Sequence, residues 1–268
     1  MTNSSKLCSQ LIDVTLEAGR IIMDHYHSGF DVTVKADHSP VTLADTDAEA
    51  IILKALAAIA PDIPVISEEA ASQGFIPDIG DRFFLVDPLD GTKEFIQHND
   101  EFTVNIALIE NTTPVMGIVY APALERMFFS PTPNKAFELE LSCTASPQLD
   151  KAQKIEVRTP PDHGLTAAVS RSHIDAETDR FLEQFNIAER RRAGSSLKFC
   201  LIAAAEIDIY PRTGPTMEWD TAAGQAVLQG AGGSVTIKNG DALAYGKSDV
   251  RYKNPAFTAW GKVDIPEN

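Results

Sequence analysis

Phe83-Phe84-Leu85-Val86-Asp87-Pro88-Leu89-Asp90-Gly91-Thr92-Lys93-Glu94 is the stretch around which this chain is organised. The four apolar residues at its start are typical of a buried strand. Pro88 lacks a backbone N–H donor, so the strand is expected to stop there. Asp87 and Asp90 then lie around one sharp turn, where both carboxylates can converge on a single point.

This turn predicts a site for a hard divalent cation. The Leu89 carbonyl lies between the two carboxylates, and an all-oxygen cluster of this kind suits Mg²⁺ above all. Gly91 and Thr92 lead into the next segment, and a helix beginning there would offer its backbone N–H groups to a phosphate.

A simpler interpretation stays open at this point. Asp90-Gly91 is a common hairpin signal, and residues 102–109 alternate like a strand. The hairpin interpretation leaves Asp87 unexplained at the end of an apolar run, where an unpaired carboxylate is costly to bury.

Composition is that of an ordinary globular protein. The chain has 268 residues, 44% of them hydrophobic, and a net charge of −15. The negative charge argues against polymeric nucleic acid as a partner, although a small phosphorylated substrate fits if metal ions supply positive charge. No apolar run is long enough for a transmembrane helix, and the first residues lack the features of a signal peptide. Three scattered cysteines, Cys8, Cys143 and Cys200, indicate reduced thiols in a cytoplasm.

The first half is expected to form helices and then an antiparallel sheet. Apolar spacing predicts a helix over 6–27, and an acidic first turn predicts a second helix over 45–60. A polar turn is expected at 38–44. Three strand-like runs predict an antiparallel meander, at 102–110, 114–121 and 126–130.

The second half alternates strands and helices. We place a subdomain boundary near 140–155, so that 1–150 is an N-terminal α+β subdomain with most of the acidic motifs. The C-terminal α/β subdomain, 151–268, carries Asp220. Its elements are expected at 166–170, 174–185, 196–205, 207–210, 218–230 and 234–238.

Carboxylates stand at the start or end of four separate elements. They are Asp45, Glu68-Glu69, Asp87 with Asp90, and Asp220. Taken singly, acidic residues in a first helical turn merely complement the helix dipole, and a glutamate pair at a strand end is usually solvated. Together they supply the oxygen ligands of a two-metal site, which holds the attacking and leaving oxygens of an in-line displacement.

Several motifs resemble those of the inositol monophosphatase superfamily of Mg²⁺-dependent, lithium-sensitive phosphatases. The shared stretches are 40–45, Ser67-Glu68-Glu69, 87–92 and 218–224. Within the superfamily, the chain is most similar to the bacterial 3′(2′),5′-bisphosphate nucleotidases of the CysQ type. That similarity rests on 91–96, 101–109, Ser170-Arg171-Ser172-His173, 194–199 and 210–216.

The resemblance implies a role for each matching residue. The Mg²⁺ ligands would be Glu68, Asp87, the Leu89 carbonyl, Asp90 and Asp220. Asp45 would hydrogen-bond Thr92, and Thr92 with Glu68 would orient and activate a metal-bound water.

The same resemblance implies the contacts to substrate. The backbone N–H groups of Gly91 and Thr92 would hold the transferred phosphoryl group, beside Glu68 and Asp220. The rest of the nucleotide would meet Ser170, His173, Gly194 and Lys198. Without such a ligand, Lys198 would be a solvated lysine near a helix start.

These matches imply a layered α-β-α-β-α sandwich with mixed sheets, as in inositol monophosphatase and fructose-bisphosphatase. The implied enzyme binds two or more Mg²⁺ ions and hydrolyses the 3′-phosphate of 3′-phosphoadenosine 5′-phosphate (PAP) to AMP. Its sulfated analogue PAPS is a further candidate substrate. An inositol monophosphatase or a broader sugar-phosphate phosphatase is the alternative, and a non-catalytic binding regulator is disfavoured by the intact ligand set. Monomer and homodimer stay open, as does attachment to the cytoplasmic side of the inner membrane.

Overall fold

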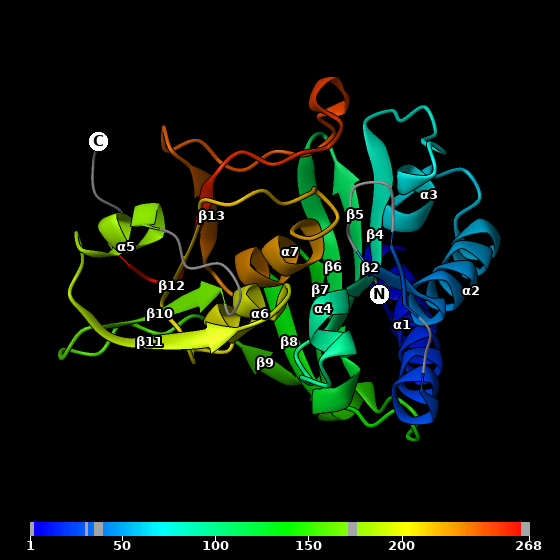
Figure 1. Ribbon diagram of the computed structural model, residues 1–268, viewed down its shortest axis with the longest axis horizontal. Helices are drawn as coiled ribbons and strands as arrows, with labels where there is room; N and C mark the ends of the chain where they lie inside the picture. The colour runs from blue at the N-terminus through cyan, green and yellow to red at the C-terminus, as the bar shows by residue number, and fades with distance from the viewer. Residues whose placement is uncertain (1–2, 30–31, 35–39, 171–175, 264–268) are drawn as a thin grey trace.

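The computed structural model describes residues 3–29, 32–34, 40–170 and 176–263 as five stacked layers. Helices α1 and α2 form one outer layer, and a seven-stranded sheet lies against them (Figure 1). Helices α6 and α7 separate this sheet from a five-stranded sheet, and α5 lies outside the second sheet. The order confirms the predicted α-β-α-β-α sandwich.

The seven-stranded sheet has the order β3-β4-β5-β6-β7-β8-β9. Its strands are β3 (Val65–Ser67), β4 (Arg82–Asp90), β5 (Thr103–Glu110), β6 (Thr113–Ala121), β7 (Arg126–Thr132), β8 (Lys135–Glu140) and β9 (Gln153–Ile155). Strand β3 is parallel to β4, and all other pairs are antiparallel. The predicted meander is confirmed, whereas β8 lies in a region where the sequence indicated no element.

Strand β4 continues through Pro88, so the prediction that it ends there was wrong. Asp87 is paired with Asn105 and Asp90 with Thr103, with a register shift between the two pairs. Three steps along β4 therefore match two along β5, which is the count of a β-bulge. A bulge tolerates proline because the extra residue makes no ladder hydrogen bond.

The first outer layer is formed by α1 (Asn3–Ser28) and α2 (Leu43–Ile59). Both follow the predicted ranges closely. A small antiparallel sheet of β1 (Val32–Val34) and β2 (Pro40–Thr42) precedes α2, so part of the polar turn expected at 38–44 is a strand. Two short helices, α3 (Glu68–Ser72) and α4 (Thr92–Ile96), begin where β3 and β4 end.

The middle layer holds α6 (Leu197–Ala203) and α7 (Ala222–Gly230). Residues 218–221 form a turn and not the first turn of α7, so the helix begins later than predicted. Helix α7 lies very close to β6, because a Cβ atom added to Gly117 would be 2.5 Å from the Ala223 carbonyl oxygen. This close approach fixes the start of α7 over the seven-stranded sheet.

The five-stranded sheet has the order β11-β10-β12-β14-β13, with β10 parallel to both neighbours. Its strands are β10 (Leu165–Ser170), β11 (Ile187–Ala193), β12 (Ile209–Arg212), β13 (Ser234–Ile237) and β14 (Phe257–Trp260). Helix α5 (Ala176–Leu182) covers its outer side. The sequence analysis missed β11, whose residues Glu189, Arg190 and Arg192 are exposed, and also β14.

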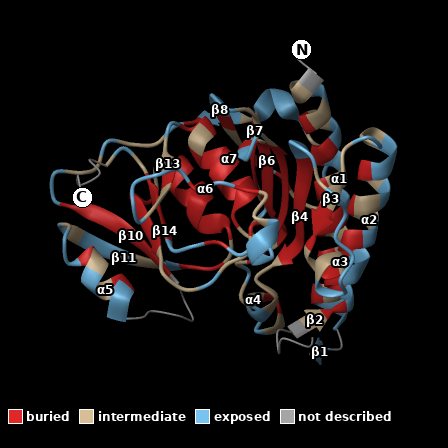
Figure 2. Cartoon of the chain, turned by 90° about the horizontal axis from the view of Figure 1, so that it is seen from above, coloured by how far each residue is buried: buried red, intermediate tan, exposed pale blue. Residues whose placement is uncertain are grey.

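Burial follows the layers (Figure 2). One core cluster lies between α1, α2 and the seven-stranded sheet, and another joins the opposite face of that sheet to α6 and α7. All three cysteines are free thiols, as predicted. Among the described helices, none is both long and apolar enough to cross a membrane.

Candidate active site

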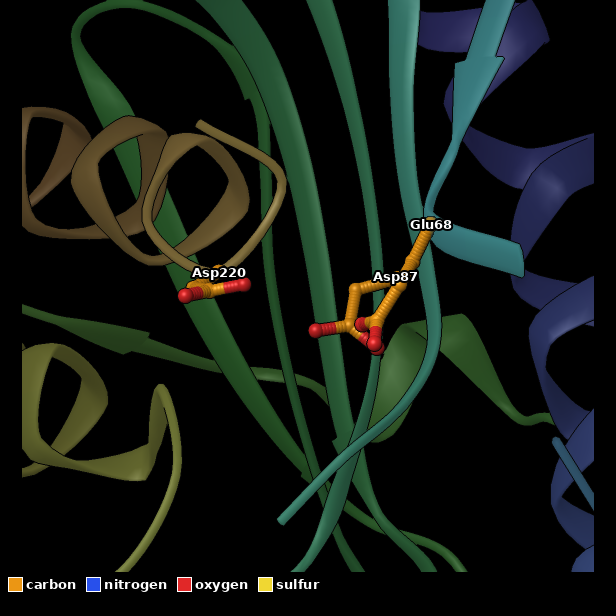
Figure 3. Close-up of side chains that lie close together, drawn as sticks. All are labelled: Glu68, Asp87 and Asp220. Carbon is orange, nitrogen blue, oxygen red and sulfur yellow. The ribbon is translucent and has the colours of Figure 1, made fainter. Parts of the chain in front are cut away.

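Three carboxylates meet between the seven-stranded sheet and α7. One oxygen from each of Glu68, Asp87 and Asp220 lies within 4.8 Å of the other two. Figure 3 shows Asp220, from the turn before α7, on one side of the cluster and Glu68 with Asp87 on the other. Residues far apart in sequence thus form one acidic cluster, as their positions at element ends predicted.

Burial and mutual repulsion both disfavour the charged carboxylates of this cluster. Burial raises the pKa of Asp87 well above its ordinary value, and the charges of Glu68 and Asp90 raise it further. Burial and the same two neighbouring carboxylates raise the pKa of Asp220, partly offset by the Met217 N–H and Arg212. A cation bound among these oxygens would relieve the repulsion.

The structure places Glu68, and not Glu69, in the cluster. Glu49 of α2 fixes this geometry, because its Oε1 accepts hydrogen bonds from the backbone N–H groups of Glu69 at 3.0 Å and Ala70 at 3.3 Å. These N–H groups lie in the first turn of α3 and have no carbonyl partner within the helix. This contact joins α2 to α3 across 20 residues of sequence, and the sequence analysis did not predict it.

Asp45 and Thr92 form the hydrogen bond that the resemblance implies. Thr92 Oγ1 is 3.0 Å from Asp45 Oδ1 and 3.3 Å from the Leu89 carbonyl oxygen. Asp45 is itself held by Thr42, whose N–H and hydroxyl both donate to its Oδ2. This capping box at the start of α2 therefore fixes a carboxylate beside the bulge of β4.

Gly91 provides the sharp change of direction between β4 and α4. Its φ of 92° lies in the left-handed region, and an added Cβ would be 3.2 Å from the Glu101 carbonyl oxygen. The positive φ favours glycine, and the close approach of Glu101 leaves little room for a side chain. The segment after Asp90 is a short helix, so the hairpin interpretation of Asp90-Gly91 was wrong.

Asp90 lies beside the three-carboxylate cluster. It is hydrogen-bonded to the loop before α6, which belongs to the second half of the chain. Its Oδ2 accepts hydrogen bonds from the Ser195 hydroxyl and the Ser196 N–H, each at 2.6 Å. Ser195 has a positive φ of 53°, which is an uncommon conformation for a residue with a side chain. The loop before α6 is therefore shaped around the Asp90 carboxylate.

A cavity opens beside these carboxylates, and cationic side chains also line it. Its lining includes Asp90 and Asp220 together with Lys93, Lys198 and Arg212. Gly91 and Gly194 also line it. Arg212 is a functional candidate that the sequence analysis missed; its position at the end of β12, close in sequence to Asp220, was the available signal.

Lys198 is buried and not a solvated surface lysine. Its side chain is 5% exposed, and its Nζ donates to the carbonyl oxygens of Ser195 at 2.6 Å and Ala193 at 3.3 Å. Burial lowers the pKa of Lys198 to about 8, although Asp90 opposes this effect. The ammonium also lies 5.1 Å from the centre of the Tyr210 ring.

Gly194 lies against the loop that follows α4. Its N–H donates to Glu101 Oε2 at 2.8 Å, and an added Cβ would be 2.8 Å from the Glu101 carbonyl oxygen. Of the remaining predicted contacts, Ser170 ends β10, but its side chain and the whole of His173 lie outside the described residues.

The residues present fit a hard divalent cation. The clustered donors are all carboxylate oxygens, and the Leu89 carbonyl lies in the same turn as Asp87, whose Oδ1 accepts the Leu89 N–H at 3.1 Å. Oxygen donors of this type suit Mg²⁺ and disfavour softer metals.

Comparison with known proteins finds relatives that match most of the chain. A model of the inositol monophosphatase family matches residues 3–263. The 3′(2′),5′-bisphosphate nucleotidase CysQ of Shigella flexneri is 43% identical over 253 residues, which cover 94% of this chain and 98% of the relative. The protein of the same name from Escherichia coli K12 is 42% identical over the same shares of both chains.

Two solved structures also align with most of the chain. The crystal structure of CysQ from Bacteroides thetaiotaomicron aligns with a TM-score of 0.81 at 35% identity, covering 97% of this chain and 98% of that one. An inositol monophosphatase from Thermotoga maritima aligns with a TM-score of 0.74 at 23% identity, covering 93% and 89%. The second comparison supports the fold alone.

Proposed function

The chain belongs to the inositol monophosphatase family, and from this premise we propose that it is a Mg²⁺-dependent 3′(2′),5′-bisphosphate nucleotidase. Its substrate would be PAP, which it would hydrolyse to AMP and inorganic phosphate, with PAPS as a second substrate. The CysQ nucleotidases at 42–43% identity support this choice within the family.

The observation that carries the proposal is a single cavity with two kinds of anion-binding group. Its lining includes Asp220 of the carboxylate cluster and the neighbouring Asp90, which would need metal ions to accept a phosphate. The same lining includes Lys198 and Arg212, which are themselves cations. A substrate with two phosphates can use both, whereas inositol 1-phosphate has one phosphate and leaves the second group without a partner.

Glu68, Asp87 and Asp220 would hold Mg²⁺, with Asp90 and the Leu89 carbonyl as further proposed ligands. When bound, Mg²⁺ would polarise the phosphoryl group and acidify the attacking water. Two or more ions per site would follow the two-metal pattern of phosphatases.

The chain itself would position and deprotonate that water. Thr92 donates its hydroxyl proton to Asp45 or Leu89, so an oxygen lone pair is left to accept a hydrogen bond from water. The Glu68 carboxylate would then take the proton as general base. The Gly91 and Thr92 N–H groups would bind the phosphoryl oxygens as negative charge develops.

The test is phosphate release from PAP and from inositol 1-phosphate, each with Mg²⁺, after chelation, and with added Li⁺. We expect hydrolysis of PAP only with Mg²⁺, and inhibition by Li⁺ as is typical of the family. Full activity after exhaustive chelation would overturn the metal assignment. A higher kcat/KM for inositol 1-phosphate than for PAP would instead make the chain an inositol monophosphatase.

A further inference from the structure

Asn105 is a buried amide that the proposed chemistry does not use. It lies within β5, and its side chain is 1% exposed. Its Oδ1 accepts hydrogen bonds from the Thr103 hydroxyl at 3.1 Å and from the Ser196 hydroxyl at 2.7 Å. Its Nδ2 has no hydrogen-bond partner among the described residues. An orphaned buried N–H group is costly and calls for a physical explanation.

The position of Asn105 in the sheet places it beside the carboxylate cluster. Asn105 lies directly opposite Asp87 in the β4–β5 register, and such cross-strand partners have Cβ atoms about 4.5–5.5 Å apart on one face of the sheet. Leu85 and Ala107 lie two residues from Asp87 and Asn105 along the same strands, so they project from the same face of the sheet. Both belong to the core that joins this face to α6 and α7. Asp87 and Asn105 therefore project into the same layer, from which Asp220 approaches.

Hydrogen bonds also connect Asn105 to Asp90. Thr103 Oγ1 lies 2.5 Å from Ser195 Oγ and 2.9 Å from Ser196 Oγ. Ser195 and Ser196 both donate to Asp90 Oδ2. Because Asn105 accepts from Thr103 and Ser196, any movement of its amide is transmitted to the groups that hold Asp90.

We propose that Asn105 is a positioning residue of the metal site. Its Oδ1 holds Ser196 and Thr103, and through them Asp90. Its Nδ2, which has no partner among the described residues, would donate to the carboxylate of Asp87, the cross-strand neighbour of Asn105. Asn105 thus fixes two proposed ligands relative to each other without touching a cation. The inference rests on the proposed Mg²⁺ site, and loss of residues that orient metal ligands typically costs about 10- to 100-fold in affinity or activity.

The test is Mg²⁺ binding to the purified full chain by calorimetry, without substrate. Asn105→Leu removes the amide at nearly constant volume, and we expect its Mg²⁺ dissociation constant to rise by about 10- to 100-fold. Phosphate release from PAP should recover partly when Mg²⁺ is raised. The matched control is Gln225→Leu: Gln225 is also a 1% exposed amide, bonded to Leu243 and Tyr245. This control should lower the melting temperature and keep the affinity for Mg²⁺.

Two results would overturn the inference: a dissociation constant of Asn105→Leu within twofold of wild type, or an equal loss in Gln225→Leu. Absence of Mg²⁺ binding by the wild-type chain would contradict the proposed function itself. If Asn105→Leu does not fold, Thr103→Val is measured in its place. It removes only the hydroxyl that connects Asn105 with Ser195, and it should weaken Mg²⁺ binding in the same direction; unchanged binding would overturn the inference.

Discussion

A lysine buried beside carboxylates needs specific partners to keep its charge, and Lys198 has two backbone carbonyl groups and an aromatic ring. Lys198 also lines the cavity that Asp90 and Arg212 line. A solvated lysine would have an unrestricted side chain and a charge weakened by water. The position of Lys198 instead favours a role in binding the phosphate that is not cleaved.

We expect Lys198→Met to lower kcat/KM for PAP about 10- to 100-fold, mainly through KM. A hydrogen bond to a charged group contributes about 1.5–3 kcal/mol, and about 1.4 kcal/mol corresponds to a factor of ten. Hydrolysis of a small monophosphate should hardly change. Lys93→Met is the control, because Lys93 lines the same cavity but is exposed and its charge is well screened. Equal losses for both substrates would mean that Lys198 serves the reacting phosphate or the fold.

The lowered pKa of Lys198 predicts a specific pH dependence. With a pKa of about 8 in the unliganded chain, Lys198 is charged below that pH and neutral above it. Since kcat/KM reports the ionisation of free enzyme, the ratio of kcat/KM for PAP to that for a monophosphate should fall as pH rises above about 8. Lys198→Arg should remove this fall, because arginine stays charged. A ratio that is flat with pH in the wild type would contradict the assignment.

At the scale of elements, the site depends on how closely α7 approaches the sheet. Gly117 allows β6 to lie against Ala223 and Ala226, and the turn just before α7 carries Asp220. The distance between Asp220 and the carboxylates at the start of α3 and in β4 is thus set by the close packing of α7 on β6.

We expect Gly117→Ala to destabilise the fold by about 1–3 kcal/mol, as inserted methyl groups do in packed cores. The new Cβ would lie 2.5 Å from the Ala223 carbonyl oxygen, so α7 must move, and Mg²⁺ binding should weaken as well. Chemical denaturation and calorimetry measure the two effects. Gly80→Ala is the control, since an added Cβ there has nothing within 4 Å. Unchanged stability of Gly117→Ala would contradict the close-approach argument.

At the scale of the whole molecule, the acidic cluster joins two layers that its own charges push apart. Glu68 and Asp87 belong to the sheet side, and Asp220 belongs to the middle helical layer. Without a cation, the repulsion between these carboxylates opposes folding. A bound cation would attract the carboxylates of both layers and so hold the layers together.

We expect Asp220→Asn to raise the melting temperature of the metal-free chain and to abolish the stabilisation by Mg²⁺. The asparagine can still accept the Met217 N–H, which Asp220 Oδ2 now accepts at 2.8 Å, while one buried charge is lost. For a chain of this size, each kcal/mol corresponds to about 2–4 °C. Thermal melts with Mg²⁺ and with a chelator measure both effects. A lower metal-free melting temperature for Asp220→Asn would contradict the repulsion argument.

Burial and repulsion of the same carboxylates together fix the sign of the pH dependence of metal-free stability. The folded-state pKa values of Asp87 and Asp220 lie above the ordinary value of 3.8, so between that value and the raised pKa the folded chain binds more protons than the unfolded chain. The free energy of unfolding contributed by these groups therefore falls as pH rises through this window. The decrease in the free energy of unfolding with rising pH should be smaller in Asp220→Asn than in the wild type. Equal pH slopes for the two proteins in urea titrations would contradict this prediction.

The sequence by itself determined the layers and most of the acidic site. Periodicity located α1, α2 and the meander, because each buries a regular apolar face that sequence spacing records. Glu68, Asp87 and Asp220 each stand at the start or end of an element, and their combination with the family resemblance predicted an oxygen-ligand cluster, which these three carboxylates form.

Only the tertiary structure decided which residues from distant segments contact these motifs and where some of the strands lie. The burial of Lys198, the capping of α3 by Glu49 and the position of Arg212 beside Asp220 depend on contacts between distant segments, and no local pattern encodes them. Strand β11 was missed because most of its side chains are exposed, so it has no apolar alternation. Strand β4 passes Pro88 because the bulge removes the need for a ladder hydrogen bond, and that need is set by its neighbour β5.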